Sequence, residues 1–189
     1  MTVALWLLML QGLIGAFDTF YYHEWKARLP ARGANAAPEL KLHAGRDFLY
    51  AILFSSLPLI TWQGWWVIVL SGVILGEIVL TLWDFVVEKV VRKGLGDVFA
   101  GERVTHAAMG IVYGGMLAFL VPTLIAWWHL PTGLRYASLS IPETLRWGLV
   151  AMGLGVFVSG VRDLYAAFGL SHGGWPWSVQ ADSSSGRQV

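Results

Sequence analysis

The sequence predicts an all-α membrane protein that folds as a bundle of five transmembrane helices, with the N-terminus outside and the C-terminus in the cytoplasm. Composition is the first observation: 56% of the 189 residues are hydrophobic and only 13% are charged, whereas about a quarter of the residues in soluble domains are charged. Between Phe48 and Trp83 the only charged side chain is Glu77. Apolar stretches such as this one reach the roughly 20 residues that a helix needs to cross a bilayer.

Polar segments divide the chain into five helical stretches. No Lys or Arg precedes Lys26 and no A-x-A cleavage pattern follows the first apolar stretch, so we interpret this stretch as a retained span rather than a signal peptide. The Pro, Gly and Asn content of residues 29–38 predicts an irregular loop there. The Trp-rich segment 61–66 predicts a tight turn at a membrane interface. One domain is expected over residues 1–170, followed by a polar, flexible tail over 171–189. The five helices are expected over residues 3–22, 39–60, 67–91, 102–129 and 143–170.

The basic residues predict the orientation. Eleven of the thirteen Lys and Arg lie on one side, ten of them in or beside the loops after the first and third helices or in the tail and Arg162 in the fifth helix towards the same side. Only Arg135 and Arg146 lie on the opposite side. The positive-inside rule places the loop-bearing end in the cytoplasm, and we expect a multi-pass protein of the plasma (inner) membrane. Because the net charge is only +1 and the basic residues flank spans, no nucleic-acid partner is expected. The absence of cysteine excludes thiolate ligands, Fe–S clusters and a Cys nucleophile.

Three carboxylates share one face of the third helix. At about 100° per residue, Asp84 and Glu88 fall within about 20° of Glu77. At a rise of about 1.5 Å per residue, Asp84 and Glu88 lie about 6 Å apart, and Glu77 lies about 10 Å deeper than Asp84. Asp84 and Glu88 can therefore contact one ion. Glu77 is expected to have a separate catalytic role as a deeper proton-relay or pocket group.

All five helices bring ionisable groups to the loop-bearing end of the bundle, and Asp18 and Asp163 belong to this band. Such groups are costly in a membrane and face the bundle interior or a water-filled cavity. Three pairs have the i, i+4 spacing that puts both side chains on one helix face: His43 with Asp47, Asp84 with Glu88, and Glu102 with His106. Imidazoles and carboxylates are ligands for Fe, Mn or Zn, and helix bundles build carboxylate-bridged sites from such groups. One or two transition-metal ions, iron first among them, are expected on six ligands: His43, Asp47, Asp84, Glu88, Glu102 and His106.

Other polar residues are secondary candidates. Arg46, Arg103 and Arg162 are each adjacent to an acid and are expected to hold an anionic group of a substrate or to neutralise buried acids, with neutralisation favoured for Arg162 beside Asp163. Tyr113 lies seven residues after His106 on the same face and is assigned to a substrate channel or to proton donation, with packing as the alternative.

The remaining histidines are left out of the predicted ligand set. His23 follows Asp18 by five residues and leaves its face if the α-helix continues. His129 lies at the opposite membrane end beside two Trp, and His172 lies in the tail.

These observations predict an integral membrane metalloenzyme, an oxidoreductase acting on a lipidic or other apolar small molecule that enters laterally between the helices. The alternative is a non-enzymatic protein, a proton-coupled carrier or accessory subunit whose buried acids and arginines form a charge network. The third interpretation is a haem held by His43 and His106. No G-x-S-x-G, phosphate-binding glycine loop or C-x-x-C-H sequence is present, so the chemistries that these motifs carry fit this sequence poorly.

Overall fold

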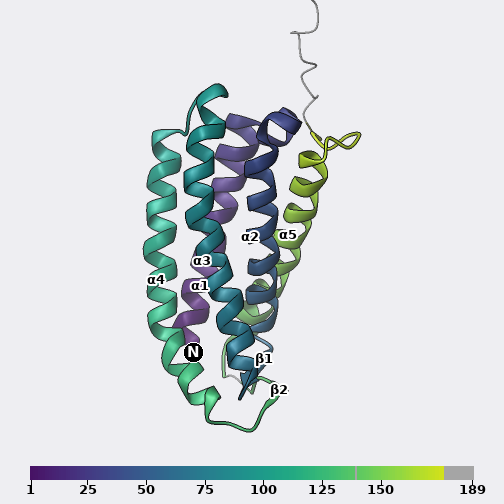
Figure 1. The fold of residues 1–189 in the computed structure, drawn as a ribbon. Coiled ribbons are helices and arrows are strands. Elements are labelled where there is room, and N and C mark those ends of the chain that lie inside the picture. Colours follow the sequence, from purple (N-terminus) through teal and green to yellow (C-terminus); the bar gives the residue numbers. More distant parts are fainter. Residues whose placement is uncertain (139, 177–189) are drawn as a thin grey trace, which may run out of the picture.

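The computed structural model, which describes residues 1–138 and 140–176, is one bundle of five long helices (Figure 1). Consecutive helices run in opposite directions, so three helix ends and two helix starts meet at the top of the figure. The predicted tail lies outside the described residues from 177 onward, and residues 171–176 form turns. The helices are α1 (Thr2–Phe17), α2 (Ala37–Ser56), α3 (Trp66–Val91), α4 (Ala100–Trp128) and α5 (Glu143–Ala167).

The chain is a multi-pass membrane protein. Four helical stretches are long and apolar enough to cross a membrane: Thr2–Ala27, Trp66–Gly94, Ala100–Trp128 and Glu143–Ala167. Helix α2 differs because its first three turns carry several charged residues, although its second half is apolar and it packs against α3 and α5. The predicted all-α bundle is therefore confirmed in its five helices. A fifth crossing by α2 and the orientation of the termini remain predictions.

The first helix changes type where it reaches the polar end of the bundle. Beyond Phe17 the backbone continues as a π-helix, η1, over Asp18–Ala27. π-Helical segments are rare and occur frequently at functional sites. The next segment, Leu29–Ala36, forms 3₁₀ turns interrupted by a non-helical Gly33. This segment was expected to be irregular. It is ordered here because Leu29 and Ala36 are buried in a small apolar cluster with Ala166 of α5.

Close packing of α2 against α5 depends on two of the glycines in α5. A Cβ added to Gly160 would lie 2.9 Å from the Asp47 Cβ and 3.2 Å from the Ala44 carbonyl oxygen, and one added to Gly153 would lie 2.3 Å from the Ser55 Oγ. Small residues let membrane helices approach in this way. Gly155 also lies in α5, but the space around its Cα is open.

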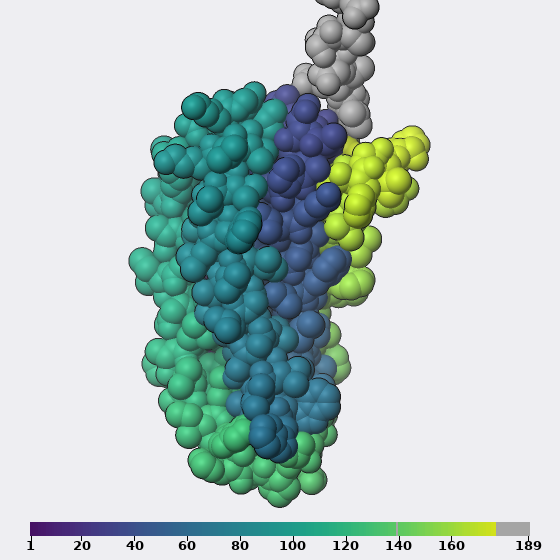
Figure 2. Space-filling model, viewed as in Figure 1, coloured from purple at the N-terminus to yellow at the C-terminus, as the bar shows by residue number. Residues whose placement is uncertain are grey.

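The opposite end of the bundle is closed by a short ribbon. Strand β1 (Ile60–Gln63) pairs antiparallel with β2 (Gly133–Tyr136), where a tight turn was expected from residues 61–66. The ribbon forms because Gly64, with φ of +57°, lets the chain turn directly against Thr132. Above it, buried apolar residues of the long helices fill the core. The side chains of α2, α3 and α4 form a continuous surface on the face seen in Figure 2.

Candidate metal centre

Charged and imidazole side chains fill the bundle interior at the end where the first and third connecting loops lie. All five helices or their extensions contribute to this cluster. Each of its members is at least nine-tenths buried, in a region where an uncompensated charge is costly. We call it the polar cluster; it contains Asp18, His23, Glu39, His43, Asp84, Glu88, Arg92, Glu102, His106 and Asp163.

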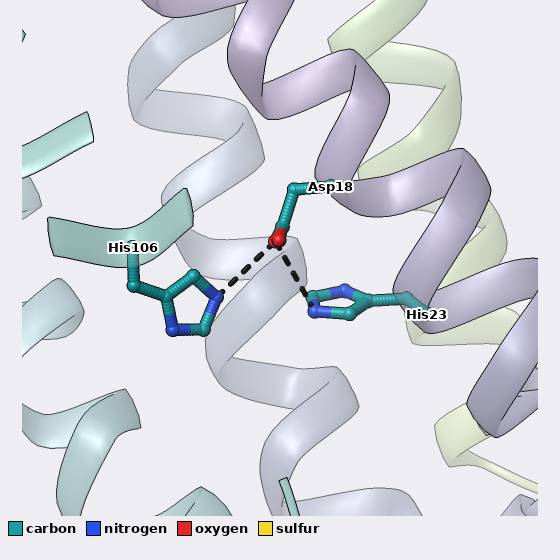
Figure 3. Close-up of side chains that lie close together, drawn as sticks. All are labelled: Asp18, His23 and His106. Carbon is teal, nitrogen blue, oxygen red and sulfur yellow. Dashed lines mark hydrogen bonds and ion pairs between the residues drawn. The ribbon is translucent and has the colours of Figure 1, made fainter. Parts of the chain in front are cut away.

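One group of possible metal ligands comprises Asp18, His23 and His106 (Figure 3). The Asp18 Oδ2 atom lies 3.2 Å from the His106 Nε2 and 3.4 Å from the His23 Nε2. Both rings thus point a nitrogen at the same carboxylate oxygen, as the figure shows. The His23 Nε2 also lies 3.2 Å from the Glu102 Oε1, so a fourth ligand borders the group.

A second group shares His106 with the first and adds Glu88 and Glu102. The Glu88 Oε1 lies 3.8 Å from the His106 Nδ1, on the opposite edge of the ring from Asp18. The His106 ring stacks on Phe85, with 5.1 Å between ring centroids. This packing holds His106 between the two groups.

Two separations within the first group, and one from it to the bordering Glu102, match the edges of a metal coordination shell. Ligand bonds of about 2.1 Å give neighbouring ligand atoms separations of about 3.0 Å in an octahedron and about 3.4 Å in a tetrahedron. The Asp18 Oδ2 lies 3.2 Å from the His106 Nε2 and 3.4 Å from the His23 Nε2, and the His23 Nε2 lies 3.2 Å from the Glu102 Oε1, so all three separations fall within this range. The Asp18 Oδ1, His23 Nε2 and Glu88 Oε2 atoms are buried and make no hydrogen bond to any described residue, although buried polar atoms are normally hydrogen-bonded.

The π-helix brings His23 beside Asp18. In a π-helix the backbone bonds connect residues five apart, and side chains five apart lie on the same side of the helix. Sequence reasoning assumed an α-helix, in which five residues turn the side chain away, and therefore left His23 out. Asp18 was placed at the correct end of the bundle but was not assigned as a ligand.

A buried arginine joins two carboxylates at the edge of the cluster. Arg92, only 1% exposed, donates from Nε to both carboxylate oxygens of Glu39 at 2.9 and 3.0 Å and from Nη2 to the Glu102 Oε1 at 3.0 Å. Sequence reasoning assigned no role to Glu39 or Arg92. The signal was present, because Glu39 precedes His43 by four residues and Arg92 follows Glu88 by four, the spacing used for the other pairs.

His43 and Asp84 lie beside the two groups but belong to neither. The His43 Nε2 is 3.2 Å from the Asp84 Oδ2, and its Nδ1 is 3.8 Å from the Asp163 Oδ2. Arg46 donates to the same Asp84 oxygen at 2.6 Å. His43 also stacks on His23, with ring centroids 4.6 Å apart. His43 is therefore in contact with the first group, and Asp84 is in contact with His43.

The other candidate residues are more dispersed. Asp47 lies in the α2–α5 interface against Gly160, outside both groups. Arg103 is exposed and pairs with Asp97. Arg162 bonds to Glu24 and to the carbonyl of Trp175, rather than forming the expected pair with its neighbour Asp163.

The deeper candidates are buried in the bundle. Glu77 accepts a hydrogen bond from the Thr81 hydroxyl at 2.6 Å. Tyr113 is buried, with its ring centroid 6.0 Å from that of Tyr50, and its hydroxyl has no hydrogen-bond partner among the described residues. His129 is exposed at the far end of α4.

No protein-family model matches the chain, and no curated protein or solved structure is significantly similar to it. The candidate site is a set of buried His and carboxylate groups that could hold a metal ion, inside a multi-pass membrane protein.

Proposed function

We propose that this protein is a membrane metalloenzyme, an oxidoreductase that acts on a lipidic or apolar small molecule at a transition-metal centre in the polar cluster. Asp18, His23 and His106 hold one ion. Glu88 and Glu102 border it and offer, with the second nitrogen of His106, a place for a second. Iron or manganese suits such a mixture of imidazole and carboxylate ligands.

The observation that carries the proposal is the convergence of ligand atoms in the group of Asp18, His23 and His106. The ligand atoms of the group lie within 4.8 Å of one another, and the separations from Asp18 to His106, from Asp18 to His23 and from His23 to the bordering Glu102 have the length of coordination-shell edges. Two of the three side chains in the group also have a buried atom without a hydrogen bond. An ion at this position would provide a partner for the His23 Nε2.

The charge balance of the polar cluster supports the same conclusion. The cluster holds six carboxylates, and in the described part of the chain Arg92 and Arg46 form ion pairs with three of them. With all six ionised, four negative charges remain, which two divalent cations would neutralise. Buried carboxylates without compensating charge are strongly destabilising, so the compensation must come from metal ions or from protonation of the cluster.

Protonation defines the competing function, a charge network in a carrier or accessory subunit. Three protonated histidines would compensate three of these four charges, and the ion pairs of Arg92 and Arg46 favour this alternative. A bis-histidine haem is not favoured, because the Nε2 atoms of His43 and His106 each face a carboxylate oxygen at 3.2 Å.

A catalytic rather than a structural centre is supported by access. Structural metal sites have all their positions filled by protein ligands, whereas catalytic sites keep one open. Asp18 and His23 both line one cavity of the bundle. An ion between them would have a free side, and a redox-active metal there would exchange electrons with whatever occupies the cavity.

Metal content tests the proposal. Protein purified without chelators is expected to retain one or two transition-metal ions per chain by elemental analysis. His23→Ala and His106→Ala should lose most of this metal. The matched control is His129→Ala, which removes a histidine at the far end of α4 and should retain it. A metal-free wild type would end the proposal and favour the charge network.

The oxidoreductase assignment has its own test. The bound metal should change oxidation state on titration with dithionite and ferricyanide, followed by electron paramagnetic resonance. If the centre binds stoichiometric zinc and no redox-active metal, the metal-binding part of the proposal stands and the oxidoreductase assignment is refuted.

A further inference from the structure

A cavity of about 550 Å³ lies between α1 with its π-helical extension, α2 and α5. This volume is within the range of about 300 to 1,000 Å³ that is typical of sites for one small molecule. It is a separate feature from the polar cluster, which it touches only at one end.

The two ends of the cavity differ in polarity. Asp18, His23 and His43 line one end, and Gly12, Phe54 and Met152 line the other. By helix rise, Gly12 lies about 9 Å deeper than Asp18, and Phe54 about 16 Å deeper than His43. Gln11 and Tyr50 are polar exceptions near the deep end, and Gln11 donates a hydrogen bond to the Tyr50 hydroxyl at 3.1 Å.

The cavity reaches the outer surface of the bundle between η1 and α5. Phe20 is 72% exposed and Val158 is 58% exposed, and both line the cavity. Because they lie within two of the membrane-spanning stretches, the mouth faces lipid. At its polar edge, the Glu24–Arg162 ion pair joins η1 to α5.

The charges around the polar end disfavour an anionic ligand. Both arginines that line the cavity are already bound to carboxylates, Arg46 to Asp84 and Arg162 to Glu24. Asp18, Asp47 and Asp163 line the same end. A carboxylate or phosphate head group would meet these acids without an available arginine.

We propose that this cavity is the binding site of an uncharged amphiphile with one hydrocarbon chain, held with its polar head at Asp18 and His23 and its chain beside Phe54 and Met152. This is the orientation of an amphiphile in one leaflet, so the ligand enters through the lateral mouth without turning over. The binding site stands on the cavity alone. A further consequence rests on the proposed function: the atoms of the ligand that react lie near its polar head and not at the end of its hydrocarbon chain.

Photolabelling tests both the site and the orientation. The probes are two long-chain primary alcohols, one with a diazirine next to the hydroxyl and one with a diazirine at the chain end. Peptides labelled by the first are expected to contain residues 18–24 or 43–47, and peptides labelled by the second Phe54 or Met152. The reversed pattern would overturn the orientation, and labelling confined to lipid-facing residues outside the cavity would overturn the site.

Two glycine substitutions provide matched variants. A Cβ at Gly155 meets nothing within 4 Å, and Gly155 lines the cavity, so Gly155→Leu should fill the cavity and lower cavity labelling at least fivefold. Gly114 in α4 is equally open but does not line it, so Gly114→Leu should label as the wild type does. Equal labelling in both variants would refute a site at the cavity.

Competition and metal content complete the experiment. Excess unlabelled alcohol should suppress labelling of the wild type, whereas the fatty acid of equal chain length should not; equal competition by the acid would refute an uncharged head. Metal content is measured on the same samples. If a metal-free protein is labelled as expected, the binding site stands and the proposed metalloenzyme is refuted. If the protein holds metal but the cavity is not labelled, the metal centre stands and the binding site is refuted.

Discussion

Replacing Arg92 by Met should destabilise the folded protein severely. Arg92 is 1% exposed, and its hydrogen bonds at 2.9, 3.0 and 3.0 Å bind two carboxylates, Glu39 and Glu102. Removing one partner of a buried ion pair costs about 3 to 5 kcal/mol, because the remaining charge stays buried without compensation. Since two carboxylates lose their cation here, we expect a loss of at least about 3 kcal/mol, or about 150-fold in the unfolding equilibrium.

Unfolding in mixed micelles with increasing dodecyl sulfate, followed by tryptophan fluorescence, measures this loss. Lys93→Met is the matched control, because it removes the same charge from the next residue, which is exposed. Adding Glu39→Gln to Arg92→Met should recover part of the stability, since it removes one of the unpaired charges. An effect of Arg92→Met no larger than that of Lys93→Met would refute the role assigned to this guanidinium.

Two further predictions concern the bundle. Reporter fusions at the C-terminal tail should show cytoplasmic activity and fusions at Thr132 should not, because the basic loops lie at the same end of the bundle as the tail. The opposite pattern would refute the predicted orientation. Gly160→Leu should separate α2 from α5 and lower the free energy of unfolding by about 1 to 3 kcal/mol or more, because an added Cβ lies 2.9 Å from that of Asp47. Gly114→Leu, facing open space, should change it by about 0.5 kcal/mol or less, and equal losses would contradict the close-packing argument.

The helices were predictable because their signal is local. Length and apolar content place a helix in a membrane whatever it packs against, and the expected stretches 67–91 and 102–129 differ from α3 and α4 by only a few residues at their ends. The ribbon of β1 and β2 was not predictable in this way. It pairs Ile60 with Tyr136, and neither four-residue strand has a pattern of its own.

The polar cluster shows the same division. The span boundaries and the alternating direction of the helices placed Glu88, Glu102 and His106 in one depth band, and these three form one of the two possible ligand groups. The other group needs His23 beside Asp18, which depends on the change from α- to π-helix at residue 18. The spacing of the chain does not reveal that change.

The sequence by itself thus determined the class of protein, the end of the bundle that carries the polar residues, and the helix faces on which several of them lie. These properties follow from the fixed geometry of a single helix in an apolar solvent. Only the tertiary structure decided which faces meet: that Arg92 reaches Glu39, 53 residues away, that Arg162 binds Glu24, and that α1, α2 and α5 enclose a cavity beside His23. Such contacts depend on how segments distant in the chain pack together, and no local pattern encodes that packing.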